Sequence, residues 1–104
     1  MTGQFKDHEG HWAMNEEMQF KATVKRNKLL GLWAAAELGL TGDEAEAYAK
    51  TVVTSDLKEP GEEDVYRKVA GDFAAKGLAI PESTLRQKMH ALAVQVREQM
   101  QAGG

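Results

Sequence analysis

Residues 25–35 read KRNKLLGLWAA, where three cations and an asparagine lead into an apolar block with a glycine in its middle. The longest apolar run of the chain, 29–36, lies here and is far shorter than the ~18 residues that a membrane-spanning helix needs. Membrane insertion is therefore not expected. The stretch instead predicts one long helix over about residues 15–38, which Gly39 is well placed to terminate. KRNK would form its solvated end, and the apolar block would belong to the core.

This predicted helix is apolar on two sides. At about 100° per residue, one side carries Met18, Ala22, Leu29, Trp33, Ala36 and Leu40, and another carries Phe20, Val24, Gly31 and Leu38. Such a helix is either central in a bundle or has a docking surface besides its core face. A glycine in the helix interior costs about 1 kcal/mol relative to alanine, and it permits close packing or a bend.

Three further helices are predicted after this one. TGDE at 41–44 is a capping-box pattern that starts a helix over about 42–56. EPG at 59–61 stops it, and the next helix begins near Glu62, where three acidic residues suit the positive end of the helix dipole. AKG at 75–77 ends that helix, and Pro81 suits the first turn of the last one. The terminal QAGG is expected to fray.

Each of these three helices has one apolar stripe that should face the core. The stripes are Ala45, Tyr48, Ala49, Val52, Val53 and Leu57; then Val65, Tyr66, Val69, Ala70 and Phe73; then Leu85, Met89, Leu92, Val96 and Met100. Four helices with short connections predict an all-α fold, a small four-helix bundle that forms one domain over residues 15–104. Residues 1–14 hold two glycines and scattered aromatics, and we expect them to be a mobile or weakly helical segment.

Composition excludes several classes of function. The chain has 104 residues and no cysteine, which rules out thiol catalysis, disulfides and cysteine-ligated zinc. A net charge of −3 argues against a dedicated DNA-binding protein, which is normally basic. The amino terminus has no basic segment followed by an apolar stretch, so no export signal is expected and a cytoplasmic location is favoured.

Chemistry at a metal or catalytic site is not expected. His8, Glu9 and His11 are one residue short of the zinc-protease spacing and lie on glycine-broken sequence, so solvated polar residues are the favoured interpretation. The run EPGEED lacks the alternating ligands of a calcium loop. No nucleophile triad surrounds His90, and no phosphate-binding glycine loop is present. The sequence therefore predicts a protein that is not an enzyme and has no cofactor or metal.

Four segments resemble the zeta subunit of bacterial F-type ATP synthases. They read FKATVKRNKLLGLWAA, TGDEAEAYAKTVVTSDL, EPGEEDVYRKV and TLRQKM, and the resemblance covers roughly residues 15–100. It implies a four-helix bundle and a non-catalytic regulator that is cytoplasmic and peripheral to the membrane-bound synthase. Family members inhibit ATP hydrolysis by inserting an amino-terminal arm between an alpha and a beta subunit of the catalytic head, against the gamma subunit of the central stalk.

Carried over to this chain, the inhibitory arm extends to about residue 18. Its partner-binding residues would be Phe5, Trp12, Ala13, Met14, Glu16, Glu17, Met18 and Phe20. The family has also been associated with adenine nucleotides, so the alternative is a module that binds or senses ADP or ATP and has weak or lost inhibitory activity. Its candidate phosphate-binding residues are Lys21, Lys25, Arg26, Asn27, Lys28, Arg67 and Lys68. By spacing alone, a solvated basic face is the favoured interpretation of Lys21, Lys25 and Lys28.

Overall fold

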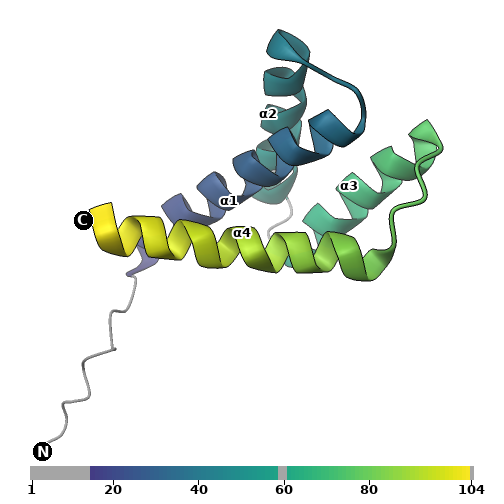
Figure 1. The fold of residues 1–104 in the computed structure, drawn as a ribbon. Helices are drawn as coiled ribbons and strands as arrows, with labels where there is room; N and C mark the ends of the chain where they lie inside the picture. The colour runs from purple at the N-terminus through teal and green to yellow at the C-terminus, as the bar shows by residue number, and fades with distance from the viewer. Residues whose placement is uncertain (1–14, 59–60, 104) are drawn as a thin grey trace, which may run out of the picture.

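The computed structural model describes residues 15–58 and 61–103, and these residues form an all-α fold of four helices (Figure 1). The helices are α1 (Glu16–Glu37), α2 (Gly42–Lys58), α3 (Glu62–Lys76) and α4 (Glu82–Gly103). The predicted fold class is confirmed. The predicted mobile segment, residues 1–14, lies outside the described residues.

Local capping chemistry places the helix ends close to where the sequence predicts them. The amide of Met18 donates a 2.8 Å hydrogen bond to the Asn15 side chain, which caps α1. Beyond the ends of α1 and α3, Gly39 and Gly77 adopt φ values of +84° and +81°, a region that favours glycine. α2 runs two residues past its predicted end. The expectation that the carboxyl terminus frays is wrong for residues 101–103, because α4 continues through Gly103.

α1 is the central helix. It packs against α2, α3 and α4, whereas the backbones of α2 and α4 do not pack directly against each other along the described residues. In Figure 1 the amino-terminal turns of α1 lie beside the carboxyl-terminal turns of α4, and α2 crosses behind the other half of α1. The two ends of α1 therefore have different neighbours.

The core agrees with the predicted stripes of α3 and α4 but only in part with the two predicted sides of α1. Gly31 and Leu38 of one side are buried, and Leu29, Trp33 and Leu40 of the other pack against the core. Val65, Val69 and Phe73 are buried in α3, as are Leu85, Met89, Leu92 and Val96 in α4. The buried residues of α1 are Asn27, Leu30, Gly31, Ala34 and Ala35, and Leu38, which caps its carboxyl end, is buried as well. Because three helices cover α1, its buried face is set by their positions and by small residues, which carry little periodic signal.

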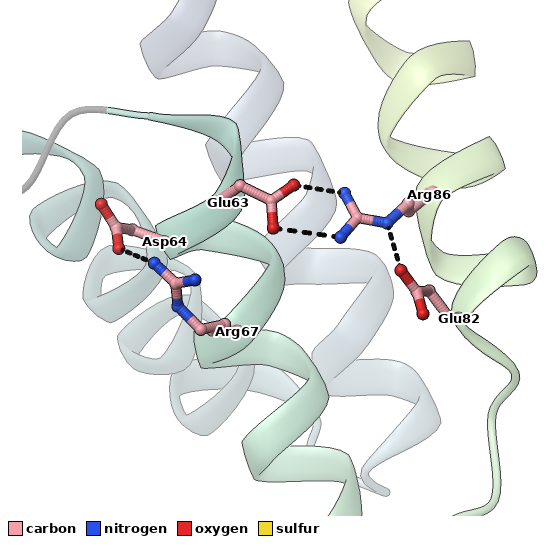
Figure 2. Close-up of polar contacts among 5 residues, drawn as sticks. All are labelled: Glu63, Asp64, Arg67, Glu82 and Arg86. Carbon is pink, nitrogen blue, oxygen red and sulfur yellow. Dashed lines mark hydrogen bonds and ion pairs between the residues drawn. The ribbon is translucent and has the colours of Figure 1, made fainter.

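Polar side chains tie the helices together at their edges. Figure 2 shows Arg86 of α4 binding both carboxylate oxygens of Glu63 in α3, at 2.8 and 3.1 Å, and Glu82 at 2.7 Å. The Arg86 guanidinium also lies 4.0 Å from the ring centre of Tyr66. These hydrogen bonds raise the pKa of Arg86 and lower the pKa of Glu63. The contact fixes the start of α3 against the start of α4.

Candidate functional site

The predicted arm residues divide at the start of α1. Phe5, Trp12, Ala13 and Met14 lie outside the described residues. The other four, Glu16, Glu17, Met18 and Phe20, occupy the first two turns of α1. The two glutamates suit the positive end of the helix dipole.

Phe20 is the most exposed large apolar side chain among the residues that the structure describes. Its side chain is 56% exposed, and the next is Val94 of α4 at 40%. Exposed aromatic side chains of this size are enriched at protein interfaces. This end of α1 therefore has a feature of a contact surface.

The predicted phosphate-binding residues fall into two separate groups. Five lie on α1, where Lys21 pairs with Glu17 at 3.3 Å and Lys28 with Glu46 of α2 at 3.9 Å. Lys25 is exposed beside them. Such pairs on an exposed surface contribute little to stability.

The other two phosphate candidates lie on α3. Arg67 pairs with Asp64 at 2.7 Å (Figure 2), and Lys68 pairs with Asp72 at 2.8 Å. Lys68 borders an open cavity of about 430 Å³ whose other lining residues, Lys50, Thr51, Thr54 and Ser55, come from α2. The helix that completes this cavity is therefore α2, and the cations of α1 are not part of its lining.

A groove lies between the amino-terminal half of α1 and the carboxyl-terminal half of α4. Its volume is about 370 Å³, and its lining residues are Gln19, Ala22, Thr23 and Arg26 of α1 with Ala93, Val94 and Arg97 of α4. We call this the α1–α4 groove. Three of the lining side chains are apolar, two are arginines and none is acidic. This composition suits a partner that combines an apolar contact with negative charge.

The sequence predicts Arg26 as a phosphate-binding residue, and the pattern within single helices does not predict the α4 residues of the groove. The sequence contains one signal for this groove. Val94 is a large apolar residue that is not part of the stripe by which α4 faces the core. The groove itself depends on how α1 and α4 cross, which periodicity within one helix does not contain.

Asn27 is buried, although KRNK is predicted to be a solvated end of the helix. Its side chain is 1% exposed. Arg26 donates a 2.8 Å hydrogen bond from Nε to the Asn27 Oδ1. The Asn27 Nδ2 has no hydrogen-bond partner within the described structure, a situation that costs about 1–3 kcal/mol for a buried donor. The buried amide thus fixes the guanidinium of Arg26 beside the groove and is itself only half satisfied.

Within residues 15–58 and 61–103, no group of three His, Asp or Glu side chains is placed to hold a metal ion. His8, Glu9 and His11, which are not expected to form a metal site, lie outside the described residues. None of the helices seen in the structure is long and apolar enough to cross a membrane.

Comparison with known proteins identifies a family and a similar solved structure. The family model of ATPase inhibitor subunit zeta matches residues 2–99. A protein whose solution NMR structure has been determined shares 48% sequence identity with this chain, with a TM-score of 0.71. The similarity covers 84% of this chain and 99% of that one. No curated protein matches the chain.

Proposed function

The chain belongs to the ATPase inhibitor subunit zeta family, and we propose on this premise that it restrains ATP hydrolysis by the F-type ATP synthase. The observation that carries the proposal is the family match, which spans residues 2–99 and so includes nearly all of the predicted arm, the first three helices and most of α4. In this proposal the protein is a non-catalytic regulator without a cofactor. It works in the bacterial cytoplasm, at the catalytic head of the membrane-bound enzyme.

The proposed mechanism uses residues 1–18 as an arm and the helices as its base. The arm would enter a cleft between an alpha and a beta subunit, against the gamma subunit, and Phe20 would complete the contact. The described part of the arm agrees with this division, since none of residues 15–18 belongs to the hydrophobic core, whose buried residues run from Leu30 to Leu92. Inhibition requires that the arm bind one rotary conformation much better than the others, because equal affinity for all would shift no population.

The test compares the full chain with a variant that lacks residues 1–14. This deletion leaves the Asn15 cap of α1 in place. We expect the full chain to slow ATP hydrolysis by the catalytic head of its own organism, and the shortened chain to lose that effect while keeping its helical circular dichroism and thermal midpoint. Full inhibition by the shortened chain would contradict the arm mechanism.

Adenine-nucleotide sensing is the second candidate, and the cavity beside Lys68 favours it. Two lysines and three hydroxyl side chains line that cavity, and such groups suit phosphate oxygens. Titration with ADP or ATP, followed by amide chemical shifts, tests this candidate. We expect shifts at Lys50, Thr54 and Lys68 if nucleotide binds there, and unchanged shifts at millimolar nucleotide would remove it.

A further inference from the structure

We propose that the α1–α4 groove is a second docking surface, which binds an acidic, partly apolar surface of the ATP synthase catalytic head beside the cleft that the arm enters. This inference rests on the proposed function and adds a contact made by the helices themselves. Its occupant is a surface of the same head.

The continuity of α1 is the first argument. The helix begins at Glu16, immediately after the segment assigned to the arm, and runs without interruption through the groove residues Gln19 and Arg26. One helical turn advances 5.4 Å, so the groove wall begins within one turn of the first helical residue. Whatever surface surrounds the bound arm must therefore lie close to the groove.

The exposed apolar side chains are the second argument. Phe20 and Val94 are the two large apolar side chains left substantially exposed in the part of the chain that the structure describes. Val94 lines the groove, and Phe20 is the neighbour in sequence of the groove residue Gln19. Both therefore lie at the end of the molecule where α1 begins. Burying them against a partner would remove apolar surface from water.

The charge and the way in which it is held are the third argument. Arg26 and Arg97 come from different helices and flank a lining without acidic side chains. The hydrogen bond from Arg26 to the buried Oδ1 of Asn27 fixes one guanidinium in place. An arginine whose position is fixed in advance loses less side-chain entropy when it pairs with a carboxylate. Asn27 thus acts as a positioning residue for a contact to negative charge.

The test fills the groove in the full-length chain. Ala93→Trp places a large side chain in the groove, and Ala91→Trp is the matched control, since Ala91 is an exposed residue of α4 that is not part of the groove lining. We expect Ala93→Trp to raise the concentration for half-inhibition of ATP hydrolysis by about tenfold or more, as loss of a central contact does. Ala91→Trp should stay within about twofold of the wild type.

A second variant tests the charge and does not depend on the folding of the first. Arg97→Glu reverses a groove charge, and Lys76→Glu reverses a charge on α3 outside the groove. We expect Arg97→Glu to weaken inhibition, with a larger effect at low salt than at high salt, because exposed charge pairs are screened. Lys76→Glu should leave the half-inhibition concentration unchanged at both salt concentrations.

The outcomes separate the two proposals. A wild-type chain that neither binds nor slows the catalytic head overturns the proposed function and the docking surface with it. A wild-type chain that inhibits, with Ala93→Trp and Arg97→Glu equally potent, overturns the docking surface alone. If Ala93→Trp instead abolishes self-association in sedimentation while inhibition is unchanged, the groove joins two copies of the chain and the proposal is overturned.

Discussion

Gly31 of α1 lies directly against the backbone of Ala49 in α2. A methyl group on Gly31 would lie 2.6 Å from the Ala49 Cα and 3.0 Å from its Cβ. Real side-chain carbons do not approach a backbone atom this closely, so any larger residue forces the two helices apart. The glycine therefore sets the distance between α1 and α2, and the cost of about 1 kcal/mol that it brings to an isolated helix is offset by this packing.

Gly31→Ala should lower the free energy of unfolding by about 1–3 kcal/mol, although alanine is the better helix former. The matched control is Gly71→Ala in α3, since Gly71 is an exposed helical glycine with no atom within 4 Å of the added methyl group. There we expect a gain of up to about 1 kcal/mol from helix propensity alone. Urea unfolding at equilibrium measures both. If Gly31→Ala gained as much as Gly71→Ala, the close approach of α1 and α2 would not contribute to stability.

Replacing Asn27 by leucine should stabilise the fold and weaken the function. The change removes a buried Nδ2 that has no partner in the described structure. It replaces the amide with an apolar side chain of similar size. We expect the free energy of unfolding to rise by about 1 kcal/mol. The same change removes the acceptor that holds Arg26, so inhibition of ATP hydrolysis should become weaker. Greater stability with unchanged inhibition would show that Asn27 does not position Arg26 for binding.

Asn15 is expected to determine where α1 begins. Its side chain accepts a 2.8 Å hydrogen bond from the amide of Met18, which has no partner one turn back within the helix. Asn15→Ala should lower the free energy of unfolding by about 1 kcal/mol and increase hydrogen exchange in the first turn. Asn15→Asp keeps an acceptor at the cap and should be neutral or slightly stabilising, because a carboxylate also suits the helix dipole. Equal exchange rates in all three proteins would contradict the capping role.

Helix boundaries were predictable from sequence because their causes are local. Asn15, Gly39 and Gly77 act on the turn in which they stand, and the structure places them at the ends of α1 and α3. The stripes of α3 and α4 were also predictable, since each of these helices turns one apolar face to the core.

The buried face of α1 and the candidate site depend on contacts between helices, which a single-helix pattern does not contain. Leu30 and Ala34 are buried because α1 is surrounded by three helices, and neither residue stands out by periodicity. The α1–α4 groove needs the crossing of two helices that are distant in the sequence. The pair of Glu63 and Arg86 is separated by 23 residues, and only the packing of α3 on α4 brings it together.

The contact between Glu63 and Arg86 predicts how stability changes with pH. Hydrogen bonding from Arg86 lowers the pKa of Glu63 below its ordinary value of 4.5. A carboxylate with a lowered pKa in the folded state stabilises the fold at pH values above its unfolded pKa, and this contribution is lost as the pH falls through the folded pKa. The wild type should therefore be more stable than Glu63→Gln at pH 7, and the difference should disappear in acid. Urea midpoints of both proteins across this range measure it.

The control for this prediction is Glu46→Gln. Glu46 meets Lys28 at 3.9 Å with both side chains more than half exposed, a contact that contributes little. We expect its urea midpoint to follow that of the wild type at every pH. Because Glu63 is also exposed and its partner Arg86 binds Glu82 as well, salt should reduce the difference at pH 7. A difference between wild type and Glu63→Gln that stayed constant from pH 7 into acid would mean that the ionised carboxylate is not what stabilises the contact with α4.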